Sequence, residues 1–278
     1  MDQCASVVEL TISCRNLPDM DVLSKSDPIC VVFLKDPSLE VWKEIGRTEI
    51  IWDNLNPEFS KKITMTYMFE QRQLLKFELY DIDAESSDLD KHDFLGRLEV
   101  TLGEIVATAG LQHFERPLIG GPHSSKPSTI KVLAEEVSSC KEEYHFNFDA
   151  QRLPKRFFGQ NSFFYEIHKS TEQSGFSLVY RSPTVKANKA QCEWPQITLN
   201  MYSLCNGDMD RNIKLTLRKY KSNGSHRIIG EANSTVRGMS ESTKTGNKLT
   251  FNMGSSVLRL SQFSKGSHSS FLDFIRVG

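Results

Sequence analysis

The sequence predicts an all-β chain that folds as two tandem β-sandwiches, and three observations support this prediction. Apolar and polar residues alternate along many short segments, and this period of two buries one face of a strand and exposes the other. Turn signals rich in Asn, Gly and Pro separate the segments. The pattern also repeats, because Phe94-Leu95-Gly96 recurs as Ile228-Ile229-Gly230 and Pro57 recurs as Pro195. The 278 residues therefore accommodate two copies of a domain of ordinary size.

The alternating segments, taken in chain order, predict individual strands. They are Val7–Ser13, Leu75–Tyr80, Tyr144–Asp149, Ile197–Met201 and Ile213–Leu217, and we expect one further strand to close each copy, at Ser128–Glu135 and near Phe271–Ile275. Leu102–Ala109 is the single segment that we expect to be helical. The first copy ends after Ser128–Glu135, so the boundary falls near Ser138-Ser139-Cys140-Lys141, and the predicted domains are residues 1–138 and 139–278.

The charge is distributed unevenly along the chain. Residues 1–138 carry 24 acidic and 14 basic side chains, a net charge of −10. Residues 139–278 carry 11 acidic and 20 basic side chains, a net charge of +9. An acidic half joined to a basic half indicates that the two halves have different partners, although the whole chain is nearly neutral.

Other features limit the class of protein. No apolar run approaches the ~18 residues that a membrane span requires, and the first residues lack the pattern of a secretory signal. The six cysteines are scattered and form no CxxC pair. We therefore expect free thiols in a reducing cytoplasm, rather than a zinc site or a disulfide framework.

Aspartates gather at predicted strand ends in the first half. Asp21 and Asp27 lie in one loop, Asp81 and Asp83 open a second loop, and Asp93 closes it. The Asp-x-Asp spacing places two carboxylates on the same side of an extended chain. Calcium takes six to eight oxygen ligands, many of them carboxylates. Aspartate is also common in turns, so one loop alone would be weak support, whereas both loops together predict a cation site.

These motifs resemble those of the C2 domain family. The matching residues are Leu17-Pro18, Asp21, Ser26-Asp27-Pro28, Leu55-Asn56-Pro57-x-Phe59, Tyr80-Asp81-x-Asp83 and Asp93-Phe94-Leu95-Gly96. More narrowly, the tandem pair is similar to the copines, in Ser24–Cys30, Ala134-Glu135-Glu136, Ser203–Asp210 and Phe271–Ile275. The resemblance covers essentially the whole chain, which ends where a copine would continue into its von Willebrand A domain. We therefore expect a short copine-like protein or a truncated form.

The resemblance implies a fold and a metal site. Each sandwich would have eight antiparallel strands in the permuted type II order, with the last strand at the C-terminal end of the domain. The first domain would bind Ca²⁺, as two ions. Its ligands would be Asp21, Asp27, Asp81, Asp83 and Asp93, with Asp90 as an additional candidate. Apolar residues near the loop tips would insert into lipid, although ordinary exposed residues look the same; they are Met20, Val22, Leu23 and Leu89.

The matching positions of the second half are basic. Lys219 and Lys221 fall at the Asp-x-Asp positions, and Arg227 replaces the last aspartate. We therefore expect no calcium site of this kind in the second domain. The first loop of this half adds Arg152, Lys155 and Arg156, and a further patch comprises Lys186, Lys189, Lys214 and Arg218. Such clusters attract anionic lipid at about 1 kcal/mol per residue, unless they only keep the loops soluble.

The preferred function is calcium-dependent docking on anionic phospholipid, phosphatidylserine or a phosphoinositide. The protein would be cytoplasmic and would move to the plasma membrane or another membrane with calcium. The alternative is an adaptor that binds acidic protein partners, with membrane contact incidental. We expect no nucleic-acid partner, because the aromatic residues fall on buried faces. We also expect no enzyme, because the sequence has no GxSxG, HExxH or phosphate-loop motif.

Overall fold

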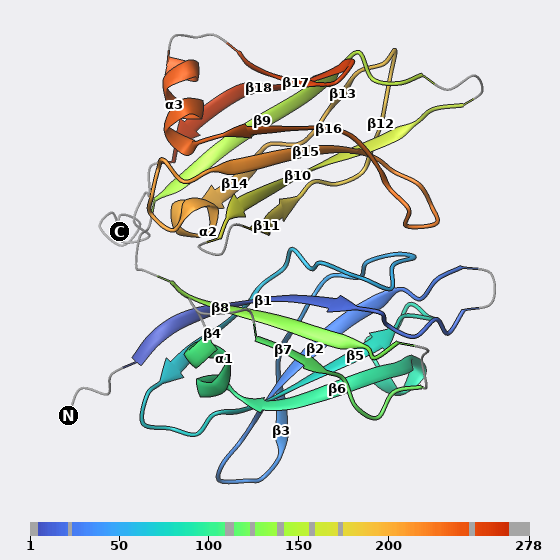
Figure 1. Ribbon diagram of the computed structural model, residues 1–278, viewed down its shortest axis with the longest axis vertical. Helices are drawn as coiled ribbons and strands as arrows, with labels where there is room; N and C mark the ends of the chain where they lie inside the picture. The colour runs from blue at the N-terminus through green and yellow to red at the C-terminus, as the bar shows by residue number, and fades with distance from the viewer. Residues whose placement is uncertain are drawn as a thin grey trace, which may run out of the picture. The chain divides into compact units, whose positions relative to one another are not determined.

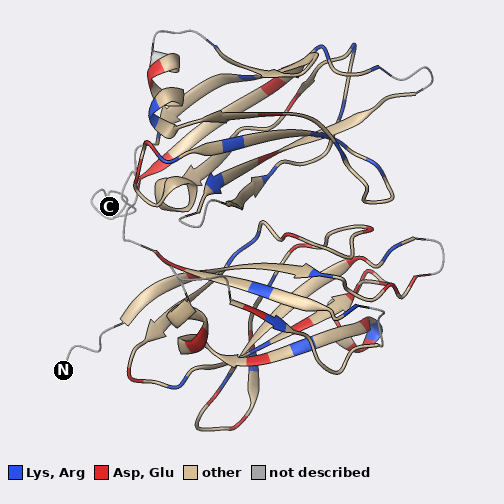
Figure 2. Cartoon of the chain, in the orientation of Figure 1, with Lys and Arg blue, Asp and Glu red and all other residues tan. Residues whose placement is uncertain are grey.

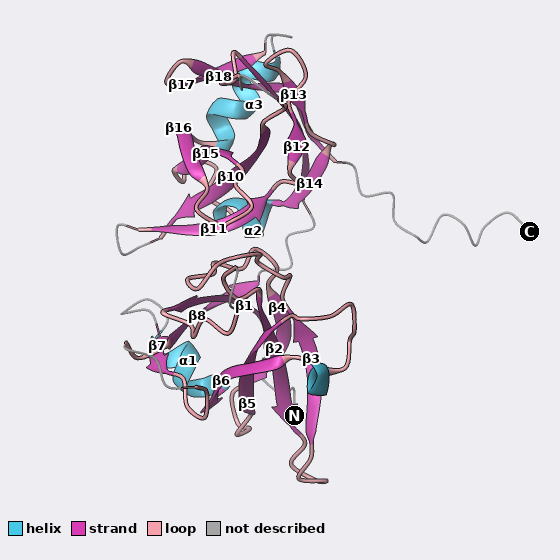
Figure 3. Ribbon diagram, turned by 90° about the vertical axis from the view of Figure 1, so that its right-hand side faces the viewer, coloured by secondary structure: helices cyan, strands magenta, loops and turns pink. Residues whose placement is uncertain are grey.

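The computed structural model describes residues 5–21, 24–108, 114–122, 126–137, 142–155, 159–171, 175–244 and 248–266. These residues are mostly in strands, which form four antiparallel sheets. The chain divides into two compact units, the first containing β1 to β8 and the second containing β9 to β18. Figures 1 and 3 show two sheets in each unit, packed face to face. The predicted fold class, two β-sandwiches, is therefore confirmed.

The first unit has eight strands among its described residues. They are β1 (Ala5–Arg15), β2 (Pro28–Lys35), β3 (Trp42–Arg47), β4 (Ile63–Met68), β5 (Leu74–Asp81), β6 (Asp93–Thr101), β7 (Phe114–Pro117) and β8 (Thr129–Val137), with the 3-10 turn η1 (Leu89–Lys91) and helix α1 (Leu102–Thr108). One sheet has the order β4-β1-β8-β7 and the other β3-β2-β5-β6. The last strand of the unit thus pairs with the first, as the expected permuted order requires.

Alternation along β1 and β5 builds the core of the first unit. Leu10, Ile12 and Cys14 of β1 and Phe77 and Leu79 of β5 are fully buried. Their neighbours in sequence point to the other face of the sheet, because successive side chains of a strand alternate. Burying such apolar side chains contributes roughly 1.5–3 kcal/mol each. This core fixes the strand ends that carry the aspartates.

The second unit has ten strands among its described residues. The elements are β9 (Glu143–Gln151), β10 (Ser162–Ser170), β11 (Phe176–Arg181), β12 (Val185–Lys186), β13 (Cys192–Glu193), β14 (Ile197–Asn200), β15 (Ile213–Lys219), β16 (Arg227–Ser234), β17 (Leu249–Met253) and β18 (Ser256–Lys265), with α2 (Met201–Cys205) and α3 (Val236–Lys244). One sheet has the order β11-β10-β15-β16 and the other β13-β9-β18-β17. Strands β12 and β14 also pair with β10 and β9.

The two extra strands come from two interrupted strand positions. β11 and β12 both pair with β10, and Pro183 lies between them. β13 and β14 both pair with β9, and Pro195 lies between them. Proline has no backbone N–H to donate to a ladder, so it interrupts the pairing. The eight strand positions of the sandwich are retained.

The expectation of a single helix was wrong. Asn200, at the predicted end of a strand, instead caps α2 by accepting a hydrogen bond from the Tyr202 backbone N–H. Helix α3 buries Val236 and Met239 against the second core. None of the helices in the described part of the chain has the length and apolar character needed to cross a bilayer. The predicted strand Phe271–Ile275 lies outside the described residues, and β18 pairs with β9 in the second unit.

The two units repeat specific hydrogen bonds at one end, which we call the loop end. In each unit it is the end where the first strand stops and the second begins. The paired bonds are Ser26 Oγ to Pro18 O (3.2 Å) and Asn161 Nδ2 to Pro154 O (2.8 Å), then Ser128 Oγ to Asn16 O (2.7 Å) and Ser256 Oγ to Arg152 O (3.0 Å). These matches allow the two loop ends to be compared residue by residue.

Candidate metal centre

Three loops converge at the loop end of the first unit: residues 16–27, 48–62 and 82–92. The strand register brings their aspartates together. Pro28 at the start of β2 pairs with Asp81 at the end of β5, and Asp81 pairs with Asp93 at the start of β6. Asp81, which lies 54 residues after Asp27 in the sequence, is therefore held at the same sheet edge as Asp27.

Three carboxylates form a cluster at this edge. Asp21, Asp81 and Asp83 each place one ligand atom within 4.8 Å of the other two. Asp81 is 1% exposed, Asp21 is half-buried and Asp83 is exposed. The cluster thus runs from the protein interior to the solvent. This gradient leaves an open side from which an ion can enter.

The environment of Asp81 fits a hard cation. Its Oδ1 accepts a hydrogen bond from the Asp27 backbone N–H at 2.5 Å. Its Oδ2 is buried and has no hydrogen-bond partner among the residues that the structure describes. Burial is the largest cause that raises the pKa of Asp81; hydrogen bonding with the Ser26 side chain and the Asp27 backbone opposes the rise, and the charges of Asp21 and Asp83 add to it. A buried carboxylate oxygen without a partner is costly, and a bound cation would supply the missing interaction.

Asp27 belongs to the same electrostatic group. Its Oδ1 accepts a hydrogen bond from the Asp53 backbone N–H at 2.6 Å. Burial is the largest cause that raises the pKa of Asp27, and the charges of Asp53, Asp81 and Asp21 add to it. The three loops are therefore tied by backbone-to-carboxylate bonds while their charges repel each other. A cation would reduce that repulsion.

His92 holds the third loop from inside. It is buried, and its Nδ1 accepts a hydrogen bond from the Asp83 backbone N–H at 3.3 Å. Its Nε2, which then carries the proton, donates to the Ser86 carbonyl at 3.0 Å. Asp83 Oδ2 also accepts from the Asp93 backbone N–H at 3.1 Å. These bonds fix the position of Asp83.

The remaining predicted ligands lie around the three-carboxylate cluster. Asp93 is exposed and faces Asp81 across the β5–β6 pairing. Asp90 lies in η1, and its backbone N–H donates to Asp88 Oδ1 at 3.3 Å. Its carboxylate is exposed and is not part of the cluster. Asp88 acts as the cap of η1.

The apolar loop residues differ in exposure. Met20 is 38% exposed and Leu89 is half-buried, whereas Val22 and Leu23 lie outside the described residues. Trp52, which the sequence reasoning missed, is 54% exposed in the middle loop. It directly precedes Asp53, whose backbone N–H binds Asp27. The sequence did contain a signal for this residue, because a tryptophan lies between two predicted strands, shortly before the turn Leu55-Asn56-Pro57.

The loop end of the second unit has the opposite charge. Phe163 pairs with Lys219, and Lys219 pairs with Arg227, in the register that Pro28, Asp81 and Asp93 have in the first unit. Lys219 thus stands at the position of Asp81 and Arg227 at that of Asp93. Figure 2 shows basic residues along the β15–β16 hairpin and acidic residues along the loops of the first unit. Among the described residues of the second unit, no three acidic, His or Cys side chains form a comparable cluster.

The further basic patch is partly neutralised. Arg218 Nε lies 2.6 Å from Glu166 Oε2. Lys214 Nζ lies 3.5 Å from Glu231 Oε1 and 4.7 Å from the centre of the Phe176 ring. Lys186 and Lys189 are exposed, on β12 and on the turn after it. Arg156 lies outside the described residues. The free positive charge is therefore greater near β12 than on β15.

Comparison with known proteins adds a family match. Residues 7–116 match the model of the C2 domain family. The calcium-bound tandem C2 domains of Extended-Synaptotagmin 2 are 14% identical, with a TM-score of 0.37, covering 94% of this chain and 96% of that one. BON1-C2B is 17% identical, with a TM-score of 0.41, covering 46% of this chain and 94% of that one. A C2 domain of plant Extended Synaptotagmin 1 is 19% identical, with a TM-score of 0.36, covering 48% of this chain and 97% of that one.

Proposed function

We propose that this chain is a calcium-dependent phospholipid-binding protein of copine type. The first unit would bind Ca²⁺ at its loop end and dock there on an anionic membrane. The observation that carries the proposal is the buried Asp81 Oδ2, which has no hydrogen-bond partner in the described part of the chain and lies beside Asp21 and Asp83. The match of residues 7–116 to the C2 domain family supports the same conclusion.

The residues of the loop end account for the response to calcium. Without an ion, the clustered aspartates repel an anionic leaflet over about a Debye length. Asp21, Asp81 and Asp83 would hold the ion, and the five predicted aspartates would balance two ions. When bound, calcium supplies positive charge and coordination positions that lipid phosphate or carboxylate oxygens complete. Met20 and Trp52 would then contact the lipid interface.

Sedimentation with vesicles tests this proposal. The full chain should pellet with phosphatidylserine-containing vesicles in calcium and remain in the supernatant in chelator. The double variant Asp81→Asn/Asp83→Asn should stay in the supernatant under both conditions. Asp88→Asn is the matched control, because it removes one charge from the same loop outside the cluster, and Asn retains the capping role. Calcium-dependent pelleting by the double variant would refute the ligand assignment.

The second unit would act as a module that does not need calcium, on membrane or on an acidic protein surface. Support comes from Lys219 and Arg227 at the aspartate positions and from the exposed Lys186 and Lys189. We place the protein in the cytoplasm, moving to membranes with calcium. An adaptor that binds only proteins would fail to pellet with any vesicle, so the same sedimentation separates the two functions.

A further inference from the structure

The third loop of the first unit, between β5 and β6, contains an exposed serine among acidic residues. The hydroxyl of this serine, Ser87, has no hydrogen-bond partner in the part of the chain that the structure describes. Glu85 precedes it by two positions, and Asp88 and Asp90 follow it by one and three. We propose that Ser87 is a phosphorylation site for an acid-directed Ser/Thr protein kinase, and that Arg47 pairs with the phosphate.

The backbone around Ser87 is accessible to an enzyme. Residues 84–88 lie in no helix or strand. The Ser86 backbone N–H donates to the Ala84 carbonyl at 2.9 Å, and the Asp88 backbone N–H donates to Ser86 Oγ at 3.1 Å. These bonds are local, so the segment can extend into the cleft of a kinase without opening a strand ladder.

The surrounding charge favours Ser87 over the neighbouring serine. Glu85, Asp88 and Asp90 are exposed, so their carboxylates can face a basic substrate groove. The third residue after Ser86 is apolar instead of acidic, and Ser86 Oγ already accepts the bond from Asp88. A kinase that reads acidic residues after its target would therefore select Ser87.

The transfer is a simple exchange of one phosphate ester for another. Ser87 Oγ attacks the γ-phosphorus of Mg-ATP, the bond from that phosphorus to the ADP oxygen breaks, and the hydroxyl proton passes to the kinase. The product, phosphoserine, carries about −1.5 to −2 charges at pH 7 and three strong acceptor oxygens. Such a group needs a cationic partner nearby if it is to order the loop.

Arg47, on β3, already lies beside Ser87. Its Nη1 donates to the Ser87 carbonyl at 3.3 Å, while its Nε and Nη2 bind the carboxylate oxygens of Glu44 at 2.8 and 2.7 Å. Both members of this ion pair are partly exposed, so the pair is weak. A doubly charged phosphate can therefore displace Glu44 from the planar guanidinium, which binds phosphate with two parallel hydrogen bonds. This exchange would fasten the third loop to β3.

The added charge falls in the loop that begins with Asp83, a member of the three-carboxylate cluster. Negative charge attracts Ca²⁺, so the phosphate should not weaken ion binding. The same charge repels an anionic leaflet, so it should raise the calcium concentration that docking requires. This consequence rests on the proposed function, whereas the assignment of Ser87 as the modified residue does not.

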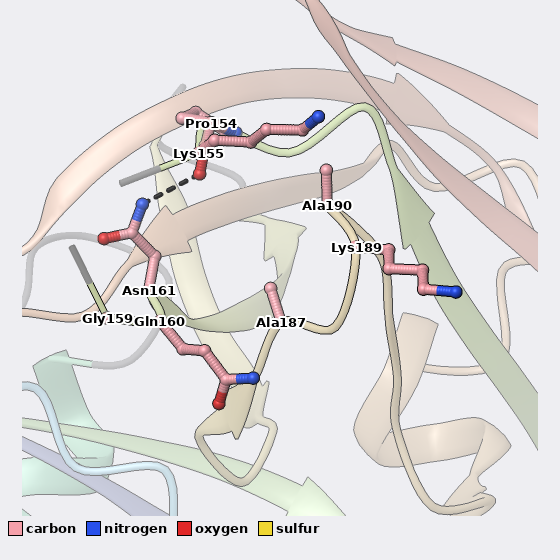
Figure 4. A pocket seen from close by; sticks show the side chains of 8 residues that line it. All are labelled: Pro154, Lys155, Gly159, Gln160, Asn161, Ala187, Lys189 and Ala190. Atoms are coloured by element: carbon pink, nitrogen blue, oxygen red, sulfur yellow. Dashed lines mark hydrogen bonds between the residues drawn. The ribbon is translucent and has the colours of Figure 1, made fainter. Parts of the chain in front are cut away.

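The loop end of the second unit provides an internal comparison. The connection between β15 and β16, which corresponds to the third loop, carries the exposed Ser222 directly after Lys221. Figure 4 shows Lys155 and Lys189 on two neighbouring segments of this loop end, around a hollow that no acidic side chain lines among the described residues. A basic substrate groove would be repelled there. An acid-directed kinase should therefore distinguish the two loop ends.

Phosphorylation of the full chain tests the site. The probe is casein kinase 2, an acid-directed enzyme, with Mg-ATP, and peptide mapping by mass spectrometry locates the phosphate. Ser87 should be modified and Ser222 should not. Ser87→Ala should remove the modification, Asp90→Asn should slow it severalfold, and Ser86→Ala, the matched control, should leave it in place. No incorporation, or incorporation mainly at another residue, would overturn the assignment.

NMR of the Arg47 side chain tests the phosphate partner. Phosphorylation should move the Nε–H resonance of Arg47, and the Ser87→Ala chain treated with the same kinase should show no change. An unmoved resonance in fully phosphorylated protein would exclude Arg47 as the partner.

Sedimentation with phosphatidylserine vesicles tests the consequence. The calcium concentration at half-maximal pelleting should rise about threefold to tenfold on phosphorylation, while calcium binding without vesicles should be no weaker by calorimetry. An unchanged pelleting midpoint would refute the regulatory role. If the unmodified chain fails to pellet at all, the proposed function is wrong, and the mapping and NMR results still decide the site and its partner.

Discussion

At the scale of single residues, Asp81 places a buried carboxylate at the loop end of the first unit. Burial, with a smaller contribution from the charges of Asp21 and Asp83, raises its pKa despite the hydrogen bonds with Ser26 and Asp27, so the charged form is disfavoured in the folded state. At neutral pH this carboxylate therefore reduces the stability of the first unit, and a bound cation would reverse the effect. Because a site for an ion is costly when empty, binding and stability are linked at this residue.

The first prediction concerns Asp81→Asn. The amide oxygen can still accept from the Asp27 N–H, but the buried charge is gone. In EDTA, the melting temperature of the first unit should stay the same or rise by a few degrees. Calcium should no longer raise it, as thermal unfolding followed by circular dichroism would show. A fall of several degrees in EDTA would contradict this account, and Asp88→Asn should behave as the unaltered chain in both buffers.

The second prediction concerns Trp52, and fluorescence measures it. Tryptophan favours the membrane interface, where its ring is apolar and its N–H stays wet. Adding calcium and phosphatidylserine vesicles should shift the emission to shorter wavelength, and Trp52→Phe should remove the shift. Trp42→Phe is the control, because Trp42 is half-buried on β3, and Trp194 is 4% exposed in the second core. A shift that survives Trp52→Phe would place the contact elsewhere.

At the scale of elements, β10 is buried on both faces. Phe163, Tyr165 and Ile167 face the core, whereas Phe164, Glu166 and His168 are buried on the opposite face. Glu166 there joins three strands, because Arg181 of β11 lies 2.9 Å away and Arg218 of β15 lies 2.6 Å away. Burial alone would raise the pKa of Glu166, but Arg181, Arg218 and His168 outweigh it, so the pKa is lowered.

The third prediction follows from this network. Glu166→Gln leaves two arginines beside an uncharged amide and should destabilise the second unit by about 3 kcal/mol. Because the folded-state pKa is lowered, the contribution of Glu166 is present above its unfolded-state pKa and is lost as pH falls through the folded-state value. Urea unfolding at neutral and acidic pH measures both effects. Glu231→Gln, an exposed position on β16, should change stability by less than about 1 kcal/mol. A Glu166→Gln chain as stable as the original would exclude the network as a stabilising element.

Some elements could be predicted from the sequence and others could not. Apolar and polar residues alternate along much of β1, β5, β9 and β15, so their period of two is visible in the sequence. β10 could not be found this way, because burial on both faces removes the alternation. Helices α2 and α3 are short and depend on tertiary contacts, such as the burial of Met239 by the second core.

Part of the candidate metal site could also be predicted from the sequence, and part could not. The Asp-x-Asp spacing pointed to Asp81 and Asp83, and the first loop pointed to Asp21, which the structure places in one cluster. Trp52 and Asp53 escaped notice because their relation to the site depends on the path of the loops. The spacing of residues within a short motif carries no information about contacts between loops that are far apart in the sequence.

At the scale of the whole molecule, each unit has its own hydrophobic core, and the two loop ends carry opposite charge. The net charges of −10 and +9 in the two sequence halves follow the same division. A chain built in this way is expected to respond to calcium in one unit only. The near-neutral total therefore conceals two loop ends of opposite charge.

The fourth prediction uses scanning calorimetry of the full chain. Calcium at about a hundred times its dissociation constant should stabilise the first unit by about 2.7 kcal/mol. One unfolding transition should therefore move up by roughly 5–10 °C, and the other should remain in place. Asp81→Asn/Asp83→Asn assigns the moving transition, because its calcium response should vanish. Equal shifts of both transitions would mean that the second unit also binds the ion.

The repeated bonds at the two loop ends have an evolutionary consequence. The groups that shape the loops are hydroxyl, amide and backbone carbonyl groups, and none of them is a charged side-chain group. A duplicated domain can therefore exchange one ligand for another by point substitution while its scaffold stays intact. Lys219 and Arg227, set in the register of Asp81 and Asp93, are the outcome expected of such divergence. The same loop scaffold can carry either acidic or basic side chains. The sign of the charge at the loop end is therefore set by a few substitutions and is not a property of the fold.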